Sequence, residues 1–173
     1  MSDPSLATTP STLRERPLDL FLVLCFAVFA FTSLVMEMYI VFDVDLRTAS
    51  DPFGRAWRFY CQWDPLFLDT PLWLRIMCGI DGFVFGPFYL LLIWALWRER
   101  AWIRLPALLY VAAIVYSTVV YFGYEFVAER ERANLLMVVL INVPYTIVPL
   151  VLGWRMWSVR AEDGSLRRRQ DHR

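Results

Sequence analysis

Four long apolar stretches constrain this chain more than any other feature of its sequence. They cover residues 18–42, 72–97, 103–126 and 135–157, and each is longer than the roughly 20 mainly apolar residues that a helix needs to cross a bilayer. A soluble core does not need apolar runs of this length. We therefore expect an all-α fold, an antiparallel bundle of four transmembrane helices with both termini on one side of the membrane.

The arginines predict which side that is, because cytoplasmic segments carry an excess of positive charge. Eleven arginines lie toward the side of the two tails and the middle connector, against six on the opposite side. We expect cytoplasmic tails at 1–17 and 158–173, the second of them basic, around a membrane domain at 18–157. All seventeen basic residues are arginine, which hints at a GC-rich bacterial genome. The membrane would be the plasma membrane in a bacterium and the endoplasmic reticulum in a eukaryote.

Charge and composition exclude several classes of function. The formal net charge is zero, so the chain has no long-range field to attract nucleic acid. Cys25, Cys61 and Cys78 form no closely spaced pair, which leaves no CxxC redox or metal motif. The single histidine, His172, lies in the C-terminal tail. We expect no metal and no organic cofactor.

The connector at 43–71 is the longest segment between two spans. Its prolines and its glycine break regular structure and leave room for one short helix at most. Between them, residues 55–63 mix arginines with aromatic rings, a composition typical of the lipid headgroup layer. We interpret this outer loop as an interfacial anchor, with a lid over a ligand as the alternative.

Two carboxylates interrupt the apolar spans, and such residues are functional candidates because a bilayer makes them costly. Counting inward at about 1.5 Å per residue places Glu37 roughly 8 Å and Asp81 roughly 13 Å below the outer surface. Asn142 of the fourth span lies at about 10 Å on the same scale. The third span carries polar side chains in the same layer: Tyr116, Ser117, Thr118 and Tyr121. All four helices therefore offer polar groups at one depth, which predicts a binding cavity.

Two carboxyl groups in one apolar site cannot both ionise cheaply, so one is expected to hold a proton while the other accepts one. Such a pair suits general acid and base chemistry, and an ionised carboxylate near aromatic rings also suits a bound cation. Two structural interpretations stay open. The polar groups can simply hydrogen-bond between helices, or Arg75 can form an ion pair with Glu37.

Prolines and glycines predict local irregularity in the spans. Pro87, Pro144 and Pro149 fall inside the second and fourth apolar stretches, where a proline removes a backbone donor and bends a helix. Gly82 and Gly86 follow closely after Asp81. We expect the second helix to be thinned there against a neighbouring helix or a ligand.

Five segments together resemble the EXPERA family of four-span membrane proteins, which includes emopamil-binding-protein sterol isomerases and sigma-2-receptor-like proteins. They are LVMEMYIVFD around Glu37, WDPLFLDTPLW at 63–73, the stretch at 81–87, WIRLPALLY at 102–110 and INVPYTIVP at 141–149. The resemblance covers residues 17–157, and the order and spacing of the segments carry it.

The resemblance implies that Glu37 and Asp81 are the two intramembrane acids of the family. Asn142 matches an asparagine of the isomerases, whereas Ser33 stands where they have an active-site histidine. Asp64 matches an acid of the outer loop whose role is structural. Tyr145 is by position a further wall of the pocket, together with Tyr116 and Tyr121.

These observations lead to two functional hypotheses and a structural one. The chain binds a sterol-like or isoprenoid lipid and moves its double bond with Glu37 and Asp81 as acid and base, or it binds such lipids and cationic amphiphiles without chemistry, as a receptor or trafficking protein. In the third, the acids only hydrogen-bond between helices. The expected partners are the lipid, the amphiphile and the membrane, and a homodimer is left open.

Overall fold

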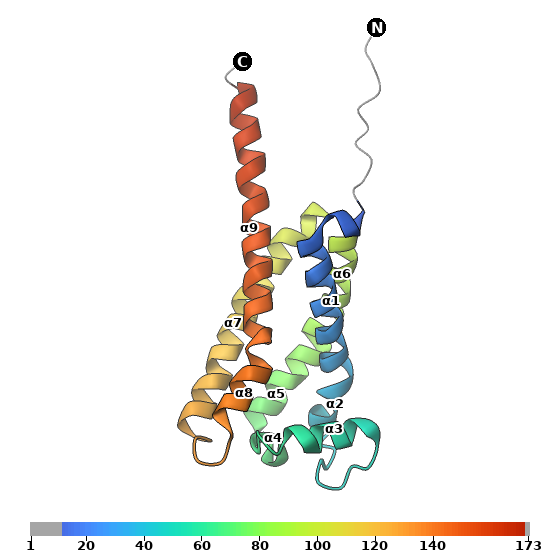
Figure 1. Ribbon diagram of the computed structural model, residues 1–173, viewed down its shortest axis with the longest axis vertical. Helices are drawn as coiled ribbons and strands as arrows, with labels where there is room; N and C mark the ends of the chain where they lie inside the picture. The colour runs from blue at the N-terminus through green and yellow to red at the C-terminus, as the bar shows by residue number, and fades with distance from the viewer. Residues whose placement is uncertain (1–11, 172–173) are drawn as a thin grey trace.

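The computed structural model describes residues 12–171, so the first eleven residues of the predicted N-terminal tail, and His172 with its neighbour, lie outside the described part. The described residues form helices and no strand. Four helical segments are long and apolar enough to span a membrane: Pro17–Val41, Leu72–Trp97, Ala101–Val127 and Leu135–Ser158. Their ends fall within two residues of the predicted ones. The all-α antiparallel bundle is confirmed (Figure 1).

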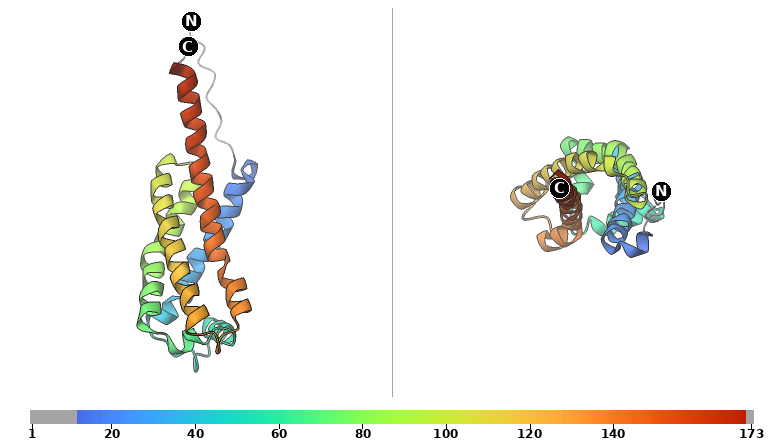
Figure 2. Two further views of the ribbon diagram at one scale, coloured as in Figure 1. Left: turned by 90° about the vertical axis from the view of Figure 1, so that its left-hand side faces the viewer. Right: turned by 90° about the horizontal axis from the view of Figure 1, so that it is seen from above.

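The bundle is built from two helix pairs. Helix α1 (Pro17–Phe31) packs along α6 (Gly86–Trp97), and α7 (Arg104–Val127) packs along α9 (Pro144–Asp171). Seen from above in Figure 2, the spans form an open arc in which α1 and α9 lie on opposite arms. Small side chains such as Ala95 and Ala107 are fully buried, which allows helix backbones to approach closely in a membrane.

Three of the four spans are interrupted, and the third, α7, is continuous. In the first span a π-helical turn at Thr32–Met36 separates α1 from α2 (Met38–Val41). In the second, a π-helical turn at Asp81–Phe85 separates α5 (Leu72–Ile80) from α6. In the fourth, α8 (Leu135–Asn142) ends just before the proline that begins α9. Turns of π-helix are rare in proteins, and those that occur are often found at functional sites. Two of them beside Glu37 and Asp81 therefore mark this region as a candidate functional site.

The prolines explain part of this pattern. Pro87 lies in the first turn of α6, and Pro144 begins α9, positions where the missing N–H costs little. Pro149 lies inside α9. The turn at Thr32–Met36 contains neither proline nor glycine, so it could not be predicted from the residue pattern.

The second span is thinned against the first, as the glycines predict. A Cβ added to Gly82 would lie 3.2 Å from the carbonyl oxygen of Ser33 and closer still to the Met38 side chain. One added to Gly86 would lie 2.7 Å from Leu34 Cδ2. Both glycines therefore permit a close approach to the neighbouring helix rather than to a ligand.

The outer loop contains two short helices, where the sequence predicted one at most. They are α3 (Pro52–Tyr60) and α4 (Leu66–Asp69). Asp51 caps the N-terminus of α3, because its side chain accepts hydrogen bonds from two backbone N–H groups of the first turn. Trp57 of α3 donates from Nε1 to the Met36 carbonyl at 2.7 Å, which fixes the loop across the end of the bundle opposite the termini (Figure 1).

Helix α9 does not end where the fourth span ends. Helix α9 continues through residues 158–171, so the described part of the predicted C-terminal tail is helical. Figure 1 shows this extension projecting beyond the other helices at the end of the bundle that carries the start of α1.

Candidate functional site

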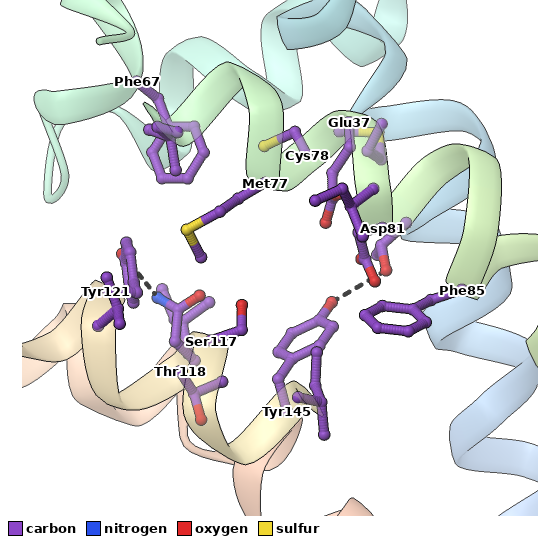
Figure 3. A pocket seen from close by; sticks show the side chains of 18 of the residues that line it. Glu37, Phe67, Met77, Cys78, Asp81, Phe85, Ser117, Thr118, Tyr121 and Tyr145 are labelled. Atoms are coloured by element: carbon purple, nitrogen blue, oxygen red, sulfur yellow. Dashed lines mark hydrogen bonds between the residues drawn. The ribbon is translucent and has the colours of Figure 1, made fainter. Parts of the chain in front are cut away.

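A cavity of about 540 Å³ lies between the two helix pairs at the level of the interrupted helices. Its walls come from all four spans and from α3 and α4 of the outer loop, and most of its lining atoms are apolar. The volume falls within the range of roughly 300–1,000 Å³ typical of small-molecule sites. Its polar side chains gather at two ends, which Figure 3 shows from close by.

Asp81 lies at one end of the cavity and is held by two hydroxyl groups. Ser33 Oγ donates to Asp81 Oδ2 at 2.6 Å, and the Tyr89 hydroxyl donates to Oδ1 at 2.9 Å. Behind Tyr89, the Tyr110 hydroxyl donates to the Tyr89 oxygen at 3.3 Å. Donors that converge on a carboxyl group favour its ionised form.

Glu37 shares this end of the cavity but has a different environment. It follows directly on the π-helical turn of the first span, and Figure 3 shows its side chain beside Asp81. Its Oε2 atom is buried and makes no hydrogen bond. An ion pair with Arg75 does not occur, since Arg75 pairs with Asp43. A carboxylate oxygen that is buried without a donor disfavours the charged form of its group.

Asn142 belongs to the other end of the cavity. Its Nδ2 donates to the Tyr60 hydroxyl at 2.8 Å and to the Val138 carbonyl at 2.8 Å, with a longer contact of 3.4 Å to the Tyr121 hydroxyl. Both tyrosines in turn donate to Asp64. The polar groups therefore form two clusters, and the hydrogen bonds of Asn142 do not join it to the two intramembrane acids.

Asp64 accepts the hydrogen bonds of both tyrosines and lies at the centre of this second cluster. It is fully buried in the outer loop, and burial raises its pKa while the bonds from Tyr121 and Tyr60 oppose the rise. The pKa of Tyr60 is raised as well, by burial first and then by the charge of Asp64. These contacts join the outer loop to α7 through Tyr121.

Tyr145 and Tyr116 occupy different parts of the wall. The Tyr145 hydroxyl donates to Thr32 Oγ1 at 3.1 Å, and its ring stacks on Phe29 at 4.3 Å between centroids. Tyr116 lines the cavity although 73% of it is exposed. Ile80 of α5 and Val120 of α7 also combine exposure with a place in the lining. The cavity therefore reaches the lipid-facing surface along this edge.

Sequence reasoning missed Tyr89, Tyr60 and Trp57 as parts of the site. Tyr89 follows Asp81 by eight residues, but the π-helical turn at Asp81–Phe85 shifts the helix phase between them, so the spacing alone did not place them together. Tyr60 and Trp57 lie in the outer loop, and their rings line the cavity. No cluster of three or more metal-ligating side chains is present among the residues that the structure describes.

Comparison with known proteins adds one finding. A family model described as EXPERA (EXPanded EBP superfamily) matches residues 52–156. No curated protein is significantly similar in sequence. The match covers the outer loop from residue 52 and the last three spans, including Asp81 and Asn142, and begins after the first span, which carries Ser33 and Glu37. It extends over more than half of the chain, which therefore belongs to EXPERA, the expanded EBP superfamily, as a multi-pass integral membrane protein.

Proposed function

We propose that this protein binds a sterol-like or isoprenoid lipid in the cavity and shifts a carbon–carbon double bond without a cofactor. The observation that carries the proposal is the unequal hydrogen bonding of two neighbouring carboxyl groups, since Asp81 accepts two hydroxyl donors and Glu37 Oε2 none. The mostly apolar lining and the exposed edge beside Tyr116 suit a ligand that arrives from the bilayer.

The two acids have distinct roles in this mechanism. The Glu37 proton adds to one alkene carbon and leaves a carbocation at the other, and Asp81 then removes a proton from the next carbon beyond the cation, so that the double bond moves by one position. The cycle moves one proton from Glu37 to Asp81, and its return resets the site. Aromatic rings stabilise a cation between the two steps, and those of Tyr145 and Phe85 lie at this end of the cavity (Figure 3).

The remaining residues position these groups. Ser33 and Tyr89 donate hydrogen bonds to Asp81 and orient its carboxyl group. Asn142 and Tyr121 form the opposite end of the cavity, where they would contact the far end of the lipid. Tyr116 lies on the exposed edge through which the lipid enters.

The test is to incubate the detergent-purified protein with a delta-8 sterol in deuterated water and to analyse the product by mass spectrometry. Double-bond migration with deuterium gain is expected from the parent and is lost in Glu37→Gln and in Asp81→Asn. The matched control is Glu131→Gln, which changes an exposed acid in the connector after α7 and should leave turnover unchanged. Full turnover in either cavity variant would refute the acid–base assignment.

A second candidate is a receptor or lipid-trafficking protein that performs no chemistry. The same geometry favours it in one respect, since an ionised Asp81 beside the rings of Tyr145 and Phe85 also suits the ammonium group of a cationic amphiphile. This candidate predicts saturable binding of the sterol and of the amphiphile, weakened by Asp81→Asn, and no product after long incubation.

We also infer an orientation. The excess of arginine toward the end of the bundle that carries the start of α1 indicates that this end faces the cytoplasm and that the outer loop faces the opposite side. A cysteine-free variant with single cysteines introduced into the exposed part of the outer loop or into the α6–α7 connector tests this by labelling of intact cells.

A further inference from the structure

A second pair of carboxyl groups lies at the outer-loop end of the bundle, outside the lining of the cavity. Asp64 belongs to the segment between α3 and α4, and Glu125 lies on α7, one turn after Tyr121. Both residues are fully buried, and each is among the groups that affect the other electrostatically. The proposed chemistry uses neither of them.

Hydrogen-bond donors are distributed very unequally over this pair. Asp64 Oδ2 accepts from the hydroxyls of Tyr121 at 2.5 Å and Tyr60 at 2.7 Å, and Oδ1 accepts from the Leu66 backbone N–H at 3.2 Å. Both carboxyl oxygens of Glu125 are buried and have no hydrogen-bond partner. Asp64 is therefore equipped to be a carboxylate, whereas a Glu125 carboxylate would be buried without compensation.

We propose that Asp64 and Glu125 form a proton-binding site that holds a single proton, carried by Glu125, and that this proton fastens the outer loop to α7. While the proton is present, the pair carries one negative charge, which the tyrosine donors stabilise. When it is lost, two carboxylates face each other in a buried site, and the loop separates from α7 to hydrate them.

The surrounding groups cannot neutralise a second negative charge. The titratable and charged side chains that face the pair are Tyr60 and Cys61 of the outer loop, Tyr121 of α7, and Glu129 with Arg132 of the connector after α7. Arg132 is already engaged by Glu129 at 3.2 Å and by Asp69 at 2.6 Å. Helix α8 contributes the uncharged Asn142.

The outer loop also covers one end of the cavity, which links the proton to ligand access. The loop contributes Trp57 and Tyr60 of α3 and Phe67 of α4 to the lining, and Asp64 lies between these two helices. Separation of the loop from α7 would uncover the cavity on its aqueous side. The protonated pair thus keeps that end closed and leaves the lipid-facing edge as the entrance.

Cys61 offers a direct probe of the loop. Its thiol is 4% exposed, and burial, followed by the charge of Asp64, raises its pKa to about 12. Labelling by a maleimide therefore requires the loop to open. Cys25 and Cys78 are replaced by alanine so that Cys61 is the single reactive thiol.

The experiment compares labelling rates of the parent with Glu125→Gln, which imitates the protonated acid and has no proton to lose. The thiolate fraction rises with pH in both proteins and largely cancels in the ratio of their rates. We expect the labelling rate of the parent divided by that of Glu125→Gln to be near one at about pH 6. By about pH 9 this ratio should grow by about tenfold or more, because only the parent has a proton to lose. The matched control Glu131→Gln changes an exposed acid of the connector after α7 and should follow the parent.

Two results would overturn the proposal: a ratio that stays flat with pH, or the same behaviour in Glu131→Gln as in Glu125→Gln. If Glu125→Gln does not fold, Asp64→Asn replaces it, since an uncharged partner also abolishes the repulsion. The infrared difference spectrum between the parent and the variant must in addition show a band of a protonated carboxylic acid that only the parent has, and the absence of this band would refute the site. No lipid substrate is needed, so the outcome is independent of the proposed isomerase function.

Discussion

Replacement of Asp19 by asparagine should destabilise the protein strongly, because this carboxylate joins the two helix pairs at the end of the bundle opposite the outer loop. Asp19 of α1 is 2% exposed. It accepts from Arg16 Nη1 at 2.8 Å and from Arg155 of α9 at 3.0 and 3.3 Å. The pair contacts between α1 and α9 are sparse, so this ion cluster is a large part of what holds the two arms of the arc together.

The magnitude follows from what each arginine loses. Breaking a fully buried ion pair from one side costs roughly 3–5 kcal/mol, because the remaining charge stays uncompensated. Here Arg16 keeps its bonds to the carbonyls of Leu96 and Trp97, and the Arg155 side chain is 29% exposed and can reach water. We therefore expect a loss of about 2–3 kcal/mol for Asp19→Asn, below the fully buried case.

The assay is reversible unfolding in mixed detergent micelles, followed by circular dichroism. Asp69 provides the matched control, since it is also an aspartate between two arginines, at 2.7 and 2.6 Å, but is 49% exposed. Asp69→Asn should remain close to the parent, because solvent screens exposed pairs. A double-mutant cycle of Asp19→Asn with Arg155→Met should show that the two losses are not additive. Equal losses for Asp19→Asn and Asp69→Asn would refute the argument from burial.

Three further predictions follow from the same structure. Tyr89→Phe removes one hydrogen-bond donor to Asp81, and a charge-assisted bond of this kind contributes about 1.5–3 kcal/mol. The variant should therefore lower isomerisation or amphiphile binding about tenfold or more. Tyr89→Phe should have no additional effect when it is combined with Asp81→Asn. Gly86→Val places a side chain against Leu34 and should lower the melting temperature far more than Gly123→Val, where the space is open. The hydrogen bond from the Tyr39 hydroxyl, followed by the backbone N–H groups of α3, lowers the pKa of Asp51. The stability that this cap provides is therefore complete above the ordinary aspartate pKa and is lost as the pH falls through the lowered pKa of Asp51. Asp51→Asn should make the free energy of unfolding depend less on pH in the acid range.

The sequence predicted the spans well because length and hydropathy alone decide them. Apolar runs of this length have one stable arrangement in a bilayer, and their observed ends differ from the expected ones by at most two residues. The thinning at Gly82 and Gly86 was predictable for a similar reason, since glycine in a membrane helix marks a close approach. That Glu37 and Asp81 line one cavity also agrees with prediction.

The direction in which each side chain points around its helix axis was not predictable. Rise per residue gives depth, and Asn142 was expected near the acids on that basis, but its hydrogen bonds lead to Tyr60 and Asp64 instead. The two π-helical turns shift the helix phase within a span, and no residue pattern announces the first of them. Tyr89 could not be distinguished from a core ring, because its partner is set by that shifted phase.

The division of the polar groups into two clusters has a chemical consequence. Each cluster pairs one carboxyl group that accepts several hydrogen bonds with one that has at least one buried oxygen without a partner, Asp81 with Glu37 and Asp64 with Glu125. The first pair lines the cavity and can exchange its proton with a ligand, whereas the second lies behind the wall and can exchange only when the loop moves. If both proposals hold, Glu125→Gln should leave the chemistry at Glu37 intact at neutral pH and extend it to alkaline pH, where the parent loses closure of the loop. Loss of activity in Glu125→Gln at neutral pH, in a protein that still folds, would mean that the second proton serves the reaction itself rather than the loop.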